Sequence, residues 1–426
     1  MKKTIPCSIT HLLAVLAMLL AIPLHAALQV QPRDVIAVSS EICPQQRMIS
    51  VDIADYFLMC QPVEGVRVIQ SGDRRESMEV FMRRLENDLT PWHPTVVLTS
   101  YGVGNGREGK QGGGYTRYQP LYEGQMIDGL KKIGVRTIVV GSSACADSYY
   151  FHNNPAEAGP WNANLADFRD LDHQLADKAG VLFADIFGAM MAAMPKAKAL
   201  YGDQYHFAAN DSWEIFPTAN GQLVMAYALL KALGCDGNIG AITVDLAANT
   251  AQGTPGQKIL SAQNGVVEVE STRYPFCFQG DPKNFNATSG IIQCFPFNDE
   301  LNRYLLVVHG LKTARAKVTW GKESREFAAA DLEKGVNLAD AFAAHTPFDG
   351  QFFKVESAVW AQQQPHLLYM QSYFHNIADF KQMAPRQTAA VDSLATAIIA
   401  QDQSQAAAAA ALVVPIRHTL KIEALP

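Results

Sequence analysis

The feature that most constrains the fold is a regular alternation of short apolar runs with helical patterns between residues 34 and 234. The runs are nearly continuous in apolar residues, which is typical of strands buried on both faces of a parallel sheet. We interpret five runs as strands: Val35–Val38, Val66–Ile69, Thr95–Thr99, Thr137–Val140 and Val181–Asp185. Helical patterns between them predict a three-layer α/β domain, in which ligands meet the carboxyl ends of the strands.

After Gly234 the pattern changes to short strands separated by turn residues. Asn264–Gly265 is a strong hairpin signal, because both central positions of a type I′ turn need positive φ. The sequence therefore predicts a small antiparallel β domain after the α/β domain. Its expected strands are Ile242–Leu246, Lys258–Ala262, Val266–Glu270, Tyr304–Val308 and Lys317–Trp320.

The C-terminal part is helical over residues 350–412 and ends in six alanines. Beyond it, Ile416, Leu420 and Ile422 share one face of a strand, so we expect the chain to return to the β domain. A detached helical tail is the alternative. The predicted units are residues 28–236 (α/β domain), 237–345 (β domain), 346–414 (the helical insertion) and 415–426 (the returning strand).

The N-terminus has the order of a secretory signal peptide. Lys2 and Lys3 precede the apolar stretch Leu12–Leu24, and the small residues Ala26 and Ala27 follow it. The stretch is shorter than the roughly 20 residues that a membrane span needs. We therefore predict a signal peptide over residues 1–27, a secreted or periplasmic protein, and no membrane span after cleavage. An uncleaved N-terminal anchor is the alternative.

Composition excludes two classes of protein and limits the cofactors. Apolar residues make up 48% of the chain and its net charge is −6, without a long basic run, so neither a disordered chain nor a nucleic-acid partner is expected. Cys277 and Cys294 flank a turn-rich segment and form the candidate disulfide, with buried free thiols as the equal alternative. The sequence has no CxxC pair, so no zinc ribbon is supported, and no metal or cofactor is expected.

A glycine-rich segment after the third strand matches a phosphate-binding pattern. Gly104, Gly106 and Gly109 fit GxGxxG. That pattern works only where a helix begins at the last glycine and points its N–H groups at the phosphates. Here Gln111 and three glycines follow, which is poor helix-forming sequence. We do not expect a nucleotide cofactor.

The same segment resembles a different family. A strand that ends in Tyr101–Gly102 before a short loop is similar to the third block of SGNH (GDSL-type) hydrolases, which reads YGMND. Arg136–Ser142 resembles the family's fourth strand, and Asn220–Gly234 resembles the helix after its last catalytic block. The resemblance covers roughly residues 34–234. It implies the SGNH fold and an ancestry in ester hydrolysis.

The family's catalytic positions are replaced in this chain. The resemblance implies a nucleophilic Ser in the first block, where this sequence has Ile42, or Glu41 if the register moves by one. The second-block Gly and the third-block Asn, whose groups would stabilise the oxyanion, fall on Arg75 and Gly104, with Asn105 at the neighbouring position. Loss of one such donor lowers the rate by about 10²–10³.

The last block lacks its histidine as well. It keeps Asp211, but the His position falls on Glu214 or Phe216, and no histidine occurs between His206 and His309. A Glu of ordinary pKa is a much weaker base than an imidazole for a hydroxyl nucleophile.

Substitutes lie nearby in the sequence. Ser40, His206 and Asp211 form a fallback catalytic set in rearranged order. One residue of shift along a strand turns a side chain to the other face, which counts against this set. Arg75, Asn105 and Glu214 are the candidate binding residues of the former ester cleft.

These observations predict a secreted SGNH-hydrolase-like protein that binds a glycan or another exported polymer without catalysis. One alternative is a divergent carbohydrate or acyl esterase with relocated catalytic residues, acting on an esterified polymer. A second alternative is a structural or assembly factor that binds a partner protein. Resemblance of fold alone does not decide between them.

Overall fold

A computed structural model describes residues 27–41, 48–72, 77–107, 119–148, 155–206 and 217–426. Five strands form a parallel sheet in the order β2-β1-β3-β4-β5. All residues of β1, β3 and β4 are buried, which explains their continuous apolar sequence. The strands are β1 (Val35–Ser40), β2 (Arg67–Gln70), β3 (Val96–Ser100), β4 (Thr137–Gly141) and β5 (Leu182–Ala184).

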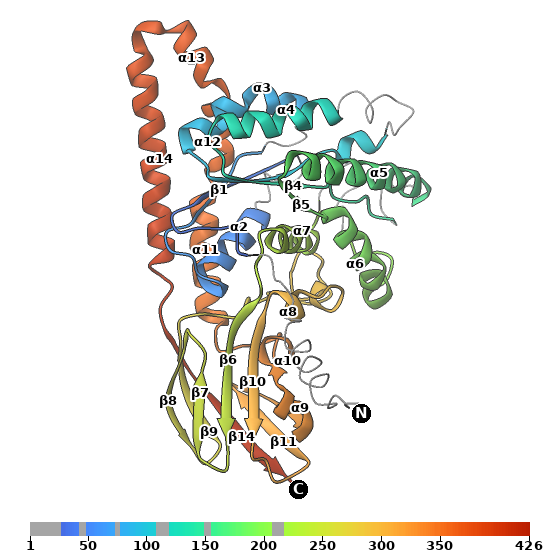
Figure 1. Ribbon diagram of the computed structural model, residues 1–426, viewed down its shortest axis with the longest axis vertical. Coiled ribbons are helices and arrows are strands. Elements are labelled where there is room, and N and C mark those ends of the chain that lie inside the picture. Colours follow the sequence, from blue (N-terminus) through green and yellow to red (C-terminus); the bar gives the residue numbers. More distant parts are fainter. Residues whose placement is uncertain (1–26, 42–47, 73–76, 108–118, 149–154, 207–216) are drawn as a thin grey trace, which may run out of the picture.

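Helices cover both faces of this sheet, as the sequence predicts (Figure 1). Along β1, Ile36 and Val38 belong to one apolar cluster and Ala37 to the other, because successive side chains point to opposite faces. The first face is covered by α2 (Met48–Asp55), which continues into the π-helical turn η1 (Tyr56–Cys60), and by α6 (Ile186–Tyr201) and α7 (Ala219–Ala232). The second is covered by α3 (Met78–Leu89) and α4 (Gln119–Lys132), while α5 (Pro155–Ala179) packs beside β4 and β5.

The β domain contains two sheets. One has the order β13-β10-β6-β7 and the other β12-β11-β14-β9-β8. The expected antiparallel arrangement is wrong at one place, because β6 pairs with β10 in parallel. The chain between these two strands is long enough for the crossover that a parallel pair needs. The strands are β6 (Asn238–Asp245), β7 (Thr250–Gly253), β8 (Gln257–Gln263), β9 (Val266–Ser271), β10 (Arg303–His309), β11 (Arg315–Trp320), β12 (Glu323–Ala328), β13 (Val336–Asn337) and β14 (Ile416–Leu425).

Two local predictions for the β domain are confirmed. Asn264 and Gly265 have φ angles of 50° and 75°, as a type I′ turn between β8 and β9 requires. The returning strand is β14, which lies between β9 and β11 at the centre of its sheet, so a detached tail is wrong. Short helices lie between the strands of this domain or directly after them: α8 (Phe297–Glu300) precedes β10, α9 (Ala329–Lys334) lies between β12 and β13, and α10 (Leu338–Ala341) follows β13.

The helical insertion runs along the edge of the parallel sheet that ends in β2. Figure 1 shows α14 extending from the level of α13 and α3, past the sheet, towards the β domain. It packs against α11, which in turn packs on α2. The helices are α11 (Asp349–Gln363), α12 (His366–Ser372), α13 (Ile377–Met383) and α14 (Thr388–Ala410), with short 3-10 turns η7 (Phe374–Asn376) and η8 (Pro385–Gln387).

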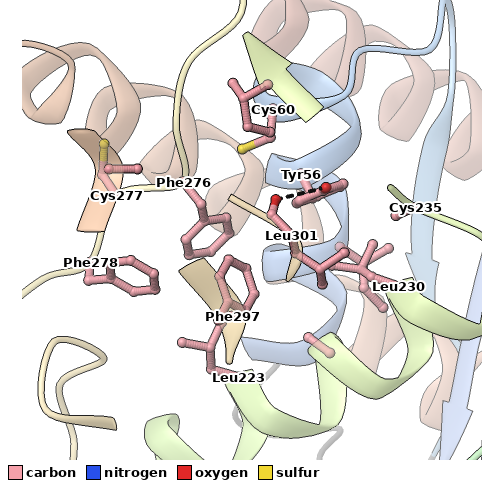
Figure 2. Close-up of a cluster of buried hydrophobic side chains, with 14 of the residues drawn as sticks. Tyr56, Cys60, Leu223, Leu230, Cys235, Phe276, Cys277, Phe278, Phe297 and Leu301 are labelled. Carbon is pink, nitrogen blue, oxygen red and sulfur yellow. Dashed lines mark hydrogen bonds between the residues drawn. The ribbon is translucent and has the colours of Figure 1, made fainter. Parts of the chain in front are cut away.

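A single buried apolar cluster continues from the α/β domain into the β domain. Figure 2 shows part of it, where the Tyr56 hydroxyl donates to the backbone oxygen of Leu301 at 2.9 Å. The rings of Phe276 and Phe297 lie 5.1 Å apart in the same cluster. This shared core fixes the β domain against the face of the sheet that α2 and α7 cover.

The cysteines are part of this packing. Of the two equal alternatives for Cys277 and Cys294, the candidate disulfide is wrong and buried free thiols are confirmed. The thiols of Cys60, Cys145 and Cys235 are free and buried as well. Burial raises the pKa of the Cys60 and Cys277 thiols well above the usual range, so these thiols stay protonated and unreactive.

Candidate functional site

The carboxyl ends of β1, β3 and β4 form one polar edge, which we call the carboxyl edge. Ser40 ends β1 and pairs with Ser100 of β3, and the Ser100 hydroxyl donates to the backbone oxygen of Ser142 after β4 at 3.0 Å. Ser39 points to the opposite face, where its hydroxyl lies 2.8 Å from the Tyr101 hydroxyl. Short polar residues thus end three adjacent strands at the place where parallel sheets bind ligands.

Ser40 is the only one of the three fallback residues that lies on this edge within the described chain. It is 2% exposed, and its Oγ has no hydrogen-bond partner among the described residues. Alternation along β1 places it on the same face as Ile36 and Val38, towards α2. A nucleophilic hydroxyl needs a base within hydrogen-bond reach, and the described residues supply none.

Glu41 follows β1 directly and is 7% exposed. Its Oε1 accepts a hydrogen bond from the backbone N–H of Gly104 at 3.2 Å, and the N–H groups of Gly102 and Val103 also bond to the carboxyl. Burial raises the pKa of Glu41 to about 7, while these hydrogen bonds favour the charged form and limit the rise. The carboxyl therefore occupies the N–H groups that the third-block loop presents at the carboxyl edge.

Gly72, after β2, touches the main chain of Ser40. A Cβ atom at position 72 would lie 2.2 Å from the Ser40 backbone oxygen and 2.6 Å from its nitrogen. Only glycine permits this close approach. The resemblance assigns the second-block glycine to position 75, and nothing in the sequence marks Gly72, because one sequence does not reveal which glycine lies against another strand.

The described beginning of the glycine-rich segment forms a short 3-10 turn, Val103–Arg107, which packs against α5. Trp161 Nε1 donates to the backbone oxygen of Val103 at 3.0 Å, and Asn164 Nδ2 donates to that of Gly106 at 2.7 Å. A Cβ atom at Gly106 would lie 2.2 Å from Trp161 Nε1. Glycine is therefore needed at position 106 so that the Trp161 ring can pack against the main chain. No sequence motif marks Trp161.

His206 lies on the segment that leads into the last block. Its ring stacks on Phe285 of the β domain, with centroids 4.6 Å apart. Lys198 of α6 holds the preceding backbone, because its Nζ donates to the oxygens of Asp203 at 3.0 Å and Tyr205 at 2.8 Å. Nζ also lies 2.9 Å from Oδ1 of the buried Asp147, so an ion pair joins α6 to the chain that follows β4.

The fallback set of Ser40, His206 and Asp211 stays a prediction, because only two of its members are described. Within the described chain, Ser40 Oγ makes no hydrogen bond, and so none to His206. Asp211, Glu214 and Arg75 lie outside the described residues. Asn105 is described only through the backbone of the 3-10 turn.

The described edge offers a hydroxyl, a proton-exchanging carboxyl and a set of backbone donors. The carboxyl occupies these donors, and no imidazole of the described residues forms a hydrogen bond with the Ser40 hydroxyl. Within the described ranges, no group of three or more His, Cys, Asp or Glu side chains is arranged to hold a metal ion. The helices of the described chain include none that is both long and apolar enough to span a membrane.

Comparisons with known proteins give structural matches alone. No family model and no curated protein matches the sequence. A gut microbial diltiazem-metabolizing enzyme has a TM-score of 0.68 and 17% identity, over 93% of this chain and 98% of that chain. This likeness shows that the two chains share a fold, and the sheet order confirms the predicted three-layer α/β domain with its β-rich second part.

Two further solved structures cover about half of this chain. A catalytic mutant of an acetylxylan esterase from Geobacillus stearothermophilus has a TM-score of 0.38 and 17% identity, over 48% of this chain and 96% of that chain. A protein described as a GDSL-like lipase from Parabacteroides merdae has a TM-score of 0.40 and 16% identity, over 49% and 98%.

Proposed function

We propose that this chain is a secreted, non-catalytic relative of SGNH hydrolases that binds a glycan or another exported polymer at its carboxyl edge. The observation that carries the proposal is the place of Glu41. Its carboxyl follows β1 directly and accepts hydrogen bonds from the third-block loop. In the resembling family this is the region of the nucleophile and of an oxyanion donor.

A carboxyl at this place opposes ester hydrolysis in two ways. Acyl transfer needs donors aimed at the oxygen that becomes negative in the transition state. Glu41 occupies such donors, and in its ionised form it places a like charge beside that oxygen. Ser40 Oγ, one residue earlier, makes no hydrogen bond to a base within the described chain.

The class of ligand follows from the predicted export. An exported protein meets extracellular polymers, and esters of such polymers are substrates that the resembling family hydrolyses. A cleft that keeps its walls and loses its proton-transfer groups retains the ability to bind them. Arg75, Asn105 and Glu214 stay predictions for the residues that line it.

Hydrolysis and binding assays on the purified mature protein test this function. We expect no turnover of acetyl and short acyl esters and measurable binding to acetylated xylan by titration calorimetry. Ser40→Ala is compared with the matched control Ser39→Ala, which changes the same strand on its other face. Ester turnover that disappears in Ser40→Ala but persists in Ser39→Ala would overturn the proposal.

A divergent ester hydrolase is the second candidate, and the full-length likeness favours it. The structural match to the diltiazem-metabolizing enzyme covers 93% of this chain, so it extends over the β domain and the helical insertion. Diltiazem and aryl esters are therefore included as substrates, together with a His206→Ala variant. Turnover that requires both Ser40 and His206 would establish this candidate in place of the first.

A further inference from the structure

The helical insertion is bound to the end of β2 by a buried histidine. His366, the first residue of α12, is fully buried, and its Nδ1 accepts a hydrogen bond from the backbone N–H of Gln70 at 3.2 Å. Because a backbone N–H can only donate, the imidazole proton is on Nε2. Nε2–H then donates to Asp402 Oδ1 on α14 at 2.7 Å. His366 therefore connects two helices of the insertion to the last residue of β2.

The charge of Asp402 is compensated within the same network. Arg67, the first residue of β2, has its Nη1 3.1 Å from Asp402 Oδ2, and Gln362 of α11 donates to Oδ1. A buried carboxylate needs such partners. The insertion thus contacts both ends of β2, through an ion pair at the start and the histidine at the end.

The end of β2 leads directly to Ser40. Gln70 pairs with Val38 of β1, and the next N–H, of Ser71, donates to the Val38 oxygen at 2.9 Å. Gly72 then lies against the main chain of Ser40. The position of Gln70 therefore sets where Gly72 lies against Ser40.

The Gln70 side chain is itself suited to bind a ligand. Paired residues of parallel strands point to the same face, so Gln70 shares the face of Val38 and Ser40. Its side chain is 98% buried, since the residue is 2% exposed, and Nε2 has no hydrogen-bond partner in the described part of the chain. The same holds for Ser40 Oγ. Two unsatisfied polar atoms on one face are unusual, because buried polar groups are nearly always bonded.

We propose that His366 is a positioning residue, which holds the Gln70 backbone so that the Gln70 amide and Gly72 stand beside Ser40, and that this amide donates a hydrogen bond to an oxygen of the ligand. The proposal rests on the proposed function, because it places the ligand at the carboxyl edge. An amide N–H and a hydroxyl carry no charge, so they fit a neutral oxygen such as a glycan hydroxyl or an ester carbonyl.

Hydrogen exchange in the full chain without ligand tests the positioning. In His366→Leu, which keeps the volume and removes both hydrogen bonds, we expect the N–H groups of Gln70 and Ser71 to exchange about tenfold faster. In His366→Gln, which offers a donor and an acceptor again, slow exchange returns. The matched control is His375→Leu, which removes the other buried histidine–carboxylate contact of the insertion, 2.6 Å from Asp88 on α3.

Affinity for acetylated xylan tests the ligand role. His366→Leu lowers this affinity about tenfold relative to His375→Leu at a similar unfolding midpoint, and His366→Gln restores it. Equal exchange at Gln70 in the two Leu variants would overturn the positioning. Unchanged affinity despite faster exchange would overturn the role of the amide. Absence of xylan binding by the unmodified protein contradicts the proposed function and the ligand role together, whereas the exchange rates still decide the positioning.

Discussion

Glu41 Oε1 accepts a hydrogen bond from the Gly104 backbone N–H at 3.2 Å and so joins the end of β1 to the third-block loop. The resemblance to SGNH hydrolases assigns an oxyanion donor to position 104 and the nucleophile to position 41 or 42. In this chain the two regions are joined by this hydrogen bond. The contact has a measurable consequence, because its acceptor is a buried group that titrates near neutral pH.

Glu41→Gln removes this titration and keeps an oxygen acceptor. The folded-state pKa of about 7 lies above the ordinary 4.5, so the folded protein binds more protons than the unfolded chain in that interval. The contribution of Glu41 to stability is full below pH 4.5 and is lost as the pH rises through 7. As the pH rises across this window, the unmodified protein loses about 3 kcal/mol of unfolding free energy through Glu41, and we expect the variant not to show this loss. Urea unfolding at both ends of the window measures it, and an equal difference at both ends would contradict the assignment.

His418 at the centre of the β domain has the opposite pH dependence. Trp320 Nε1 donates to its Nδ1 at 3.1 Å, so the proton is on Nε2, which lies 2.8 Å from Ser271 Oγ. A proton on Nδ1 would face the indole N–H, and burial lowers the His418 pKa to about 4.

Acid therefore destabilises the β domain through His418. Its folded-state pKa of about 4 is below the ordinary 6.5, so the unfolded chain binds more protons between these values. Its contribution to stability is full above pH 6.5 and is lost as the pH falls through 4. We expect His418→Gln to reduce the acid loss of unfolding free energy by about 3 kcal/mol, measured by urea unfolding across this window. A pH profile that is unchanged in the variant would contradict this role.

The regular part of the fold could be predicted because periodicity reports burial. The strands that end in Ser40 and Ser100 are buried on both faces, so each reads as an uninterrupted apolar run. Helix α6, by contrast, has apolar residues on nearly all sides and no amphipathic spacing to mark it. The parallel pairing of β6 with β10 was missed because strand patterns do not state which strands become neighbours.

The location of the candidate site stays a prediction, and its contacts could not be read from the sequence. The resemblance assigns the nucleophile position to Ile42 or Glu41 after the first strand, and Ser40 is a nearby substitute, because both assignments depend on local order along the chain. Gly72, Trp161 and His366 were missed, because each acts through a contact with a segment distant in the sequence. The burial that shifts the pKa of Glu41 is also a property of the assembled fold.

Gln70→Leu should separate stability from binding. The Gln70 amide nitrogen is buried without a partner in the described chain, so an apolar side chain of similar size removes an unsatisfied group. We expect the unfolding free energy to rise by about 1 kcal/mol, while affinity for acetylated xylan falls about tenfold. Urea unfolding and titration calorimetry on the same preparation measure both. A loss of stability would show that the amide makes a structural hydrogen bond.

Lys198→Met should release the segment that precedes the last block. The substitution removes the Lys198 cation from beside the buried Asp147 and removes the donor to the backbone oxygens of Asp203 and Tyr205. Loss of one partner from a buried ion pair costs about 3–5 kcal/mol, so we expect a fall of this size in the unfolding free energy and faster hydrogen exchange near Tyr205.

Two further variants decide whether the charge of Asp147 is the cause. Lys198→Met combined with Asp147→Leu removes both charges and should recover much of the lost unfolding free energy, because an apolar pair replaces a buried ion pair at little cost. Lys132→Met breaks an ion pair with Glu86 on the exposed surface, at 2.6 Å, and should leave stability close to that of the unmodified protein. If the double variant is as unstable as Lys198→Met, the hydrogen bonds to the two backbone oxygens, and not the charge of Asp147, make Lys198 necessary.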